Sequence, residues 1–478
     1  MQSEYVSDAD KRRAFLTGFT GSAGTAVVLA EPYSAPALDT SLFGPPDVCG
    51  RLFTDGRYFL QAVAELDATH FTLMKGGVTG VPKLEDWLLA VLPKGSRVAV
   101  DPSITSMAAY KALKAAFKDQ ISIVFLEKNL VDEVWGAARP SYSKNPLRVL
   151  GDKYTGETSA SKLERIRKKM VEQRAELLVV SALDEVAWLF NLRGADIPFN
   201  PVFRSYALIA HDSVTLYVDQ EKVTDEIRAH LKPANVRLAP YDAIWSELKT
   251  HASSSGLSSD KRIWLDPARV SSAVQACFPN AEVILEADNP IQLMKAIKNA
   301  TEVAGMRQAH KKDAAAVINF LSWLEIELLE KKNESLTECS VSDRLEAFRA
   351  EQPEFAGLSF ETIAGSGSNG AIIHYKPEPE SCKAVTAREM FLLDSGAQFL
   401  DGTTDITRTV HFGKPTEFET LAFTKVLQGH IQLAAVVFPT GTVGPTIDVL
   451  ARQKLWESGM VRADKTSCVA HNNTANRS

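Results

Sequence analysis

The sequence contains no long apolar run. No segment reaches the roughly 18 consecutive apolar residues that indicate a membrane-spanning helix. The opening segment, MQSEYVSDADKRRAF, also lacks the apolar core of a secretory signal peptide. We therefore expect no membrane partner and a cytoplasmic location.

Cysteine is scarce and scattered. The five cysteines are Cys49, Cys277, Cys339, Cys382 and Cys468, and no two of them form a C-x-x-C pair. This odd number and wide spacing argue against a disulfide framework or a zinc knuckle. Each cysteine is expected to be a reduced, buried and inert thiol.

The chain also lacks a concentrated basic region and several familiar catalytic motifs. Its net charge is -6, and the 53 basic residues are spread along the sequence, so we expect no nucleic-acid partner. The absence of G-x-S-x-G, H-E-x-x-H and P-loop motifs disfavours serine hydrolases, zincins and nucleotide-driven enzymes. Residues 365–370 match G-x-G-x-x-G, but an expected strand follows them. A dinucleotide site requires a helix at that point, so we reject this match.

The length and apolar content predict a folded protein with several domains. A chain of 478 residues with 45% hydrophobic content exceeds what one core organises. Alternating strand and helix patterns predict an α/β domain over 1–148, a second over 149–288, and an α+β domain over 289–460. Residues 33–51 are expected to be a flexible insertion, and 461–478 a disordered tail.

Short patterns within these domains predict individual elements. Strands are expected at 25–29, 97–100 and 177–180. A capping box is expected at Ser161, at the start of a basic helix. Another helix is expected to start near Asn299 and to bury one apolar face until it stops at 331–333.

The segment FLLDSGAQFLDGTTDITRT, residues 391–409, predicts a β-hairpin. With Asp401-Gly402 as the turn, Asp394 pairs with Thr409, and Asp405 points to the same face. The two aspartates are then four residues apart along the strands, which is too far for a shared metal in a flat ribbon. A metal site and a hydrogen-bonded structural pair both remain open on this pattern.

Two further residues could carry chemistry. His374 lies late in the apolar run GAIIHYKP, read as a strand, where it could be a core histidine or a catalytic one. Arg57 lies in TDGRYF, a hairpin-like element, where it could be a solvated surface residue or a substrate contact.

Several segments together resemble a known family. They are QSEY, RRAFLTGFTGSAGTA, TDGRYFLQA, LDEVAWLFNLRGAD, GAIIHY, DSGAQ and DGTTDITRT. In this order they resemble Xaa-Pro aminopeptidase (aminopeptidase P) of the eukaryotic, cytosolic, three-domain type. The resemblance implies two creatinase-like N-terminal domains followed by a pita-bread metallopeptidase domain, within a homodimer.

The same resemblance implies an activity and residue roles. The family removes the N-terminal residue from peptides with proline second, using two Mn²⁺ ions held by two aspartates, one histidine and two glutamates. Asp394 and Asp405 match the metal-binding aspartates. His374 matches a histidine that contacts the substrate near the scissile bond, and Arg57 matches a substrate-binding arginine.

The resemblance ends near Met460, so the pita-bread domain is expected to be incomplete. The family's histidine ligand and both glutamates follow that point, and neither His430 nor His471 is expected to replace the histidine. Three of five ligands would then be missing, from a truncated protein or an incomplete gene model. Two hypotheses remain: a metal-dependent aminopeptidase, or a catalytically dead protein that binds peptides or proteins.

Overall fold

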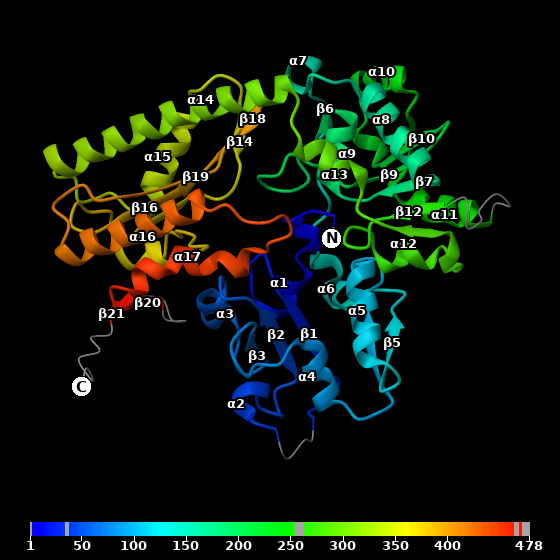
Figure 1. The fold of residues 1–478 in the computed structure, drawn as a ribbon, viewed down its shortest axis with the longest axis horizontal. Helices are drawn as coiled ribbons and strands as arrows, with labels where there is room; N and C mark the ends of the chain where they lie inside the picture. The colour runs from blue at the N-terminus through cyan, green and yellow to red at the C-terminus, as the bar shows by residue number, and fades with distance from the viewer. Residues whose placement is uncertain (1, 34–37, 254–261, 463–467, 471–478) are drawn as a thin grey trace. The chain divides into compact units, whose positions relative to one another are not determined.

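The computed structural model describes the chain except for residues 1, 34–37, 254–261, 463–467 and 471–478. It divides into two compact units (Figure 1). The first unit comprises residues 1–55, 61–310 and 398–403, and the second comprises 56–60, 311–397 and 404–478.

The N-terminal part of the first unit contains two small sheets. Strands β1 (Thr25–Val28), β2 (Gly50–Thr54) and β3 (Phe71–Lys75) form one, and β4 (Ser96–Val100) and β5 (Ile121–Phe125) form a parallel pair. The strands predicted at 25–29 and 97–100 are confirmed. The helices are α1 (Arg12–Thr17), α2 (Thr40–Phe43), α3 (Phe59–Glu65), α4 (Leu84–Val91), α5 (Met107–Phe117) and α6 (Leu130–Trp135).

The segment predicted to be a flexible insertion has regular structure in its described part. Helix α2 begins after Asp39, whose carboxylate accepts a hydrogen bond from the Ser41 amide. Arg51 is fully buried and donates to the carbonyls of Phe43, Pro45, Val48 and Gly50. The prediction therefore failed at 38–51, because a buried arginine orders these turns without any apolar period. Residues 34–37 lie outside the described part of the chain.

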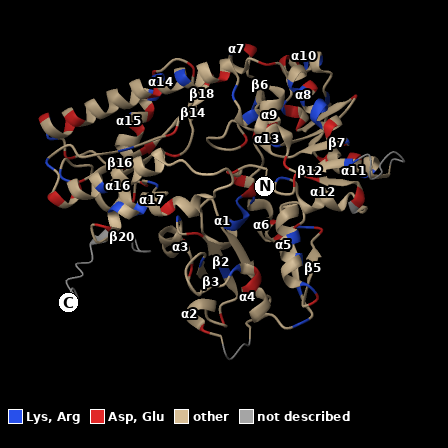
Figure 2. Ribbon diagram, in the orientation of Figure 1, with Lys and Arg blue, Asp and Glu red and all other residues tan. Residues whose placement is uncertain are grey.

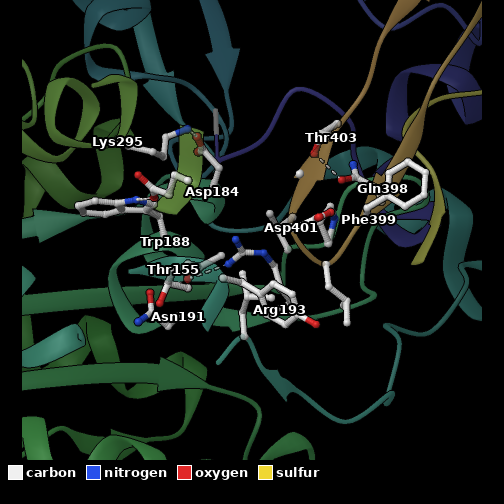
Figure 3. Close-up of a pocket in the computed structure, with 18 of the residues that line it drawn as sticks. Thr155, Asp184, Trp188, Asn191, Arg193, Lys295, Gln398, Phe399, Asp401 and Thr403 are labelled. Carbon is white, nitrogen blue, oxygen red and sulfur yellow. Dashed lines mark hydrogen bonds and ion pairs between the residues drawn. The ribbon is translucent and has the colours of Figure 1, made fainter. Parts of the chain in front are cut away.

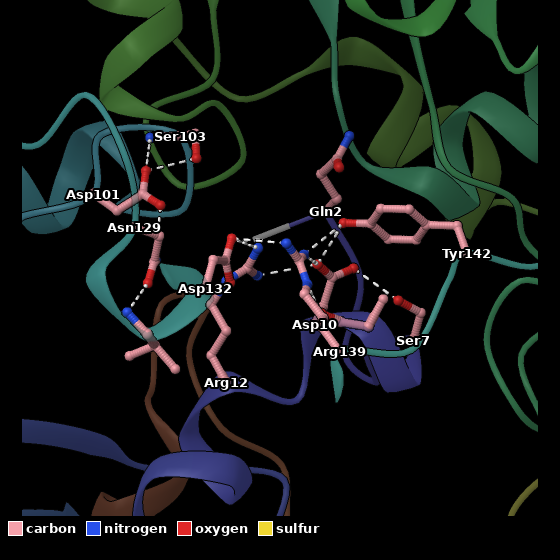
Figure 4. Close-up of polar contacts among 12 residues, drawn as sticks. Gln2, Ser7, Asp10, Arg12, Asp101, Ser103, Asn129, Asp132, Arg139 and Tyr142 are labelled. Atoms are coloured by element: carbon pink, nitrogen blue, oxygen red, sulfur yellow. Dashed lines mark hydrogen bonds and ion pairs between the residues drawn. The ribbon is translucent and has the colours of Figure 1, made fainter. Parts of the chain in front are cut away.

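An ionic network joins the first residues of the chain to helix α6 (Figure 4). Arg12 donates two hydrogen bonds to the carboxylate of Asp132, at 2.6 and 2.9 Å, and a third to Asp10. Arg139 binds the same Asp132 carboxylate, and the Tyr142 hydroxyl donates to Asp10. Despite the opposing effect of burial, these carboxylates raise the pKa of Arg12. The network thus fixes the N-terminus against residues about 120 positions later.

The rest of the first unit is built on a six-stranded mixed sheet in the order β11-β10-β9-β7-β12-β13. Its strands are β7 (Ala175–Val180), β9 (Ser205–Ala210), β10 (Val214–Val218), β11 (Arg237–Ala239), β12 (Arg262–Leu265) and β13 (Ile284–Glu286). A short ladder pairs β6 (Arg148–Val149) with β8 (Leu192–Arg193). The helices are α7 (Asp152–Thr155), α8 (Ser159–Glu172), α9 (Leu183–Phe190), α10 (Asp225–Leu231), α11 (Ile244–Ser253), α12 (Ser272–Ala276) and α13 (Pro290–Ala296).

Both faces of this sheet are buried. Along β7, Leu178 and Val180 belong to one apolar cluster while Leu177 and Val179 belong to another, as the alternation of side chains requires. Helices α8, α9, α10 and α13 contribute to the first cluster, and α11 and α12 to the second. The strand predicted at 177–180 is confirmed. Helix α8 begins earlier than predicted, because the Thr158 hydroxyl, rather than Ser161, caps it.

The second unit contains a three-stranded antiparallel sheet packed against helices. The sheet order is β15-β16-β19, with β15 (Ile363–Ser366), β16 (Phe391–Ser395) and β19 (Ile406–Val410). The helices are α15 (Glu338–Ala350), α16 (Glu417–Ala435) and α17 (Gly444–Trp456), and strand β14 (Phe355–Leu358) precedes the sheet. Strands β20 (Met460–Arg462) and β21 (Cys468–Ala470) pair near the end; the other residues of the tail predicted to be disordered lie outside the described residues.

Helix α14 (Ala300–Glu325) follows the sequence prediction closely. Asn299 and Glu302 cap its start by accepting hydrogen bonds from each other's amide groups. Val317 and Leu324 are buried in the apolar cluster of the second unit. A π-helical turn (Ile326–Glu330) extends the helix and buries Leu328 before the predicted stop.

The described residues include no helix that is both long and apolar enough to cross a membrane. Figure 2 shows Lys and Arg interspersed with Asp and Glu along the helices of both units. The absence of a nucleic-acid partner stays a prediction.

The buried Glu185 of helix α9 should make stability depend on pH. Burial, reinforced by Asp184, raises the pKa of Glu185 to about 8 from 4.5. The folded state therefore keeps a proton that the unfolded chain releases, so stability should fall as pH rises from about 4.5 to 8, by up to about 1.4 kcal/mol per pH unit. In Glu185→Gln this part of the slope should disappear, as measured by urea unfolding across that range.

The exposed Glu226→Gln provides the matched control and should retain the slope. An unchanged slope in Glu185→Gln would show that Glu185 is ionised in the folded protein.

Candidate metal centre and substrate site

The hairpin that carries the two aspartates has a different register from the predicted one. Asp394 on β16 lies opposite Thr407 on β19, not Thr409. Near the tip, β17 (Ala397–Phe399) pairs with β18 (Gly402–Thr403), with Phe399 opposite Gly402. The turn is therefore Leu400-Asp401, one residue earlier than the Asp401-Gly402 turn that composition favoured.

This register brings Asp394 and Asp405 closer along the ladder than predicted. Asp405 lies two residues before Thr407, so the offset from Asp394 is two residues and not four. By the alternation of side chains, position 405 has the same parity as Thr407 and therefore as Asp394, although it lies just before β19 begins at Ile406. The ladder is interrupted at Gly396 and at 404–405, where the Thr404 hydroxyl accepts a hydrogen bond from the Ala397 amide.

The electrostatics of Asp394 indicate a site for a cation. Burial raises the pKa of this half-buried carboxyl, and the negative charge of Asp405 raises it further, while Thr407 and His374 oppose the shift. Its Oδ1 atom is buried without a hydrogen-bond partner. A carboxylate with an unsatisfied buried oxygen beside a second carboxylate is stabilised when a positive ion binds. The donor chemistry thus fits part of a divalent metal site.

His374 lies near these aspartates but not on a strand. The apolar run that suggested a strand forms a 3-10 turn (Gly367–Ala371) followed by an irregular segment, and the His374 side chain is exposed. The prediction failed because the strand, β15, ends at Ser366. His374 and Asp394 interact electrostatically, so the structure brings them together with Asp405.

Arg57 is in the same unit as His374, next to a residue that sequence reasoning missed. The Tyr58 ring packs against the His374 ring with centroids 4.8 Å apart, and the Arg57 guanidinium lies 5.2 Å from the Tyr58 ring centroid. Tyr58 is almost fully buried. The expected hairpin at 54–59 is wrong, because β2 ends at Thr54 and α3 begins at Phe59.

Glu338 is a second residue that the sequence did not reveal. Its carboxylate is fully buried at the start of α15 and accepts hydrogen bonds from the Ser366 amide at 2.7 Å and the Lys383 amide at 2.7 Å. It also accepts from the Tyr375 hydroxyl at 2.6 Å and the Asn369 side chain at 3.1 Å. These donors span the segment that carries His374, so Glu338 holds that segment in place. Nothing in its sequence context distinguishes it from an ordinary first-turn glutamate.

A buried ion pair contacts the hairpin at Ser395. Arg349 on α15 is fully buried; it donates to Asp313 on α14 at 2.7 Å and to the Ser395 hydroxyl at 3.1 Å. Ser395 directly follows Asp394, so this pair links two helices to strand β16, which carries Asp394.

Replacement of Arg349 by methionine should destabilise the second unit. The buried Asp313 carboxylate would lose its partner, at a cost of about 3–5 kcal/mol. Thermal unfolding followed by circular dichroism should show a lower midpoint, and Asp313→Leu combined with Arg349→Met should recover part of the loss. The exposed Arg388→Met is the matched control. Equal midpoints for Arg349→Met and Arg388→Met would contradict the proposed support.

A cavity of about 340 Å³ lies elsewhere, in the first unit (Figure 3). Its lining includes Trp188, Arg193 and the hairpin-tip residues Gln398 and Asp401, but neither Asp394 nor Asp405. Lys162 also lines it; burial lowers the pKa of Lys162 to about 8, and its ammonium donates to the Trp188 carbonyl at 2.8 Å and to Asn191 at 2.6 Å. These contacts make Lys162 a structural residue.

Side chains that could bind a metal rarely lie together in the described part of the chain. No cluster of three or more His, Cys, Asp or Glu side chains suited to a metal is found among the described residues. The aspartate pair with His374 is the candidate reacting centre because of the electrostatics of Asp394 and its unsatisfied buried oxygen.

Three family models match consecutive parts of the chain. Residues 5–132 and 138–302 each match a Creatinase/Prolidase N-terminal domain, and residues 304–473 match Metallopeptidase family M24. The matches show two creatinase-type N-terminal domains followed by a domain of the pita-bread type. The predicted fold class is confirmed in these terms.

Individual proteins match over nearly the whole chain. A Xaa-Pro aminopeptidase 1 of Dictyostelium discoideum is 45% identical, covering 97% of this chain and 71% of its own length. A probable Xaa-Pro aminopeptidase P of Chaetomium globosum is also 45% identical, with 95% and 71% covered. The crystal structure of a cytosolic X-prolyl aminopeptidase with a di-nuclear active site, from Caenorhabditis elegans, has a TM-score of 0.87 at 36% identity and covers 96% of this chain and 71% of its own.

Proposed function

This chain belongs to the Xaa-Pro aminopeptidase family of metal-dependent peptidases, and we propose that its reaction is removal of the N-terminal residue from peptides with proline in second position. The observation that supports this most directly is the pair Asp394 and Asp405 on one hairpin face beside His374. The scissile bond in such peptides has an imide nitrogen without an N–H. A site for it must recognise the substrate without that donor.

The residue roles follow from chemistry and position. Asp394 and Asp405 supply carboxylate oxygens to two divalent ions, which we propose to be Mn²⁺, a hard ion that carboxylates suit. When bound, such ions lower the pKa of a coordinated water and polarise the scissile carbonyl. His374, held by packing on Tyr58, presents a ring nitrogen that can hydrogen-bond the peptide next to the scissile bond. Arg57 supplies a cationic contact for the peptide.

We further propose a homodimer, a cytoplasmic location and three domains with boundaries near residues 148 and 288. The domain proposal is supported by the change of architecture between the two-sheet N-terminal part, the six-stranded sheet and the antiparallel sheet of the second unit. The cytoplasmic proposal is supported by the related nematode enzyme, whose structure is described as that of a cytosolic protein.

We propose that this 478-residue chain binds metal weakly by itself. Two carboxylates leave most of an ion's coordination sphere to water, and the described residues offer no third ligand in a cluster. This observation also favours a second candidate function, in which the protein binds peptides without cleaving them.

Asp394→Asn should weaken Mn²⁺ binding at least about tenfold, because a coordinating oxygen loses its charge. Titration calorimetry with MnCl₂ measures the affinity directly. Glu417→Gln, an exposed change on α16, is the control and should bind as the parent chain does. If Asp394→Asn binds Mn²⁺ as tightly as the parent, the metal lies elsewhere.

Activity separates the two candidate functions. The purified chain should release the N-terminal residue from an Xaa-Pro-Xaa tripeptide only when Mn²⁺ is present, and Asp405→Ala should abolish the release. Liquid chromatography of the products measures both. A folded chain that binds the tripeptide but never releases its first residue would overturn the catalytic proposal in favour of the binding one.

A further inference from the structure

Two of the cysteines lie opposite each other in the second unit. Thr337 forms a β-bridge with Ala384, and the Glu338 amide donates to the Lys383 carbonyl at 3.0 Å. Cys339 directly follows Glu338 in the first turn of α15, and Cys382 directly precedes Lys383, so the two cysteines flank this backbone contact.

The two thiols also interact with each other. Cys339 and Cys382 share a hydrogen bond between their side chains, and both side chains are partly exposed. The sequence predicted reduced, buried and inert thiols. The four described cysteines are free thiols, as predicted, but each is partly exposed and not buried.

We propose that Cys339 and Cys382 form a reversible disulfide when the protein meets a two-electron oxidant of the peroxide class. The bond would join the start of helix α15 to the segment that carries His374. The backbone hydrogen bond and the bridge already hold these two segments together in the reduced chain.

The surroundings of the two sulfurs assign each a role. The hydrogen bond from Cys339 lowers the pKa of Cys382, whereas burial raises the pKa of Cys339. Cys382 is therefore the thiolate that attacks first. It bonds to one peroxide oxygen, the O–O bond breaks, and the leaving oxygen takes a proton to become water. Cys339 then attacks the sulfenic sulfur, loses its proton, and the hydroxyl leaves as a second water.

The oxidised bond would act on the same segment as Glu338. The Glu338 carboxylate holds the segment through the amides of Ser366 and Lys383, and Cys382 immediately precedes Lys383. A covalent link at this point adds a second anchor, eight residues after His374. We expect the segment to become more resistant to proteolysis, without unfolding of the unit.

Thiol counting tests the proposal on the whole chain. After dilute hydrogen peroxide, removal of the oxidant and denaturation, the number of titratable thiols should fall from five to three. Dithiothreitol should restore all five. Peptide mapping without reductant should recover one linked pair containing Cys339 and Cys382, from protein that runs as a monomer on a non-reducing gel.

Three variants make the result specific. Cys339→Ser and Cys382→Ser should each begin with four thiols and form no internal linkage, whereas Cys277→Ser, the matched control, should fall from four to two. Circular dichroism of each variant before oxidation establishes that it is folded. Retention of five thiols in the parent, or a linkage that uses Cys49 or Cys277, would overturn the proposal. Oxidation of Cys382 to sulfinic acid without linkage would also overturn it.

Discussion

The second unit depends on one buried carboxylate. Glu338 is removed from water at the start of α15, where an isolated charge is costly unless several donors surround it. The backbone of the neighbouring segment supplies two of those donors, and the side chains of Asn369 and Tyr375 supply others. These contacts hold both ends of an irregular segment, and His374 lies within that segment.

The hairpin adds the two aspartates that we propose as metal ligands. Its strands are held by the ladder to β15 and by the Arg349 contact at Ser395, directly after Asp394. The cavity lined by Lys162 and Arg193 also includes residues of the hairpin tip, such as Gln398, but its cations donate to backbone carbonyls. Neither Asp394 nor Asp405 lines it.

Periodic elements were predictable from the sequence, and contacts between distant residues were not. Strand β7 and helix α14 follow from runs of apolar side chains, which report burial directly. The hairpin itself was also predictable, but its register was wrong by two residues, because Asp401-Gly402 is a favourable turn by composition while the ladder places the turn at Leu400-Asp401. Glu338 and Tyr58 both help to position His374, but they do so through partners far along the chain, which no local sequence pattern reveals. No local pattern reveals the role of the buried Arg51 either.

Gly396 cannot be replaced by a larger residue without moving the hairpin. A Cβ atom at this position would collide with the Thr404 carbonyl and the Ser359 hydroxyl, so only a hydrogen atom fits between the two arms of the hairpin. A larger residue at 396 would have to displace the main chain at Thr404. Because Thr404 directly precedes Asp405, the position of the Asp405 carboxylate relative to Asp394 depends on a residue that carries no functional group itself.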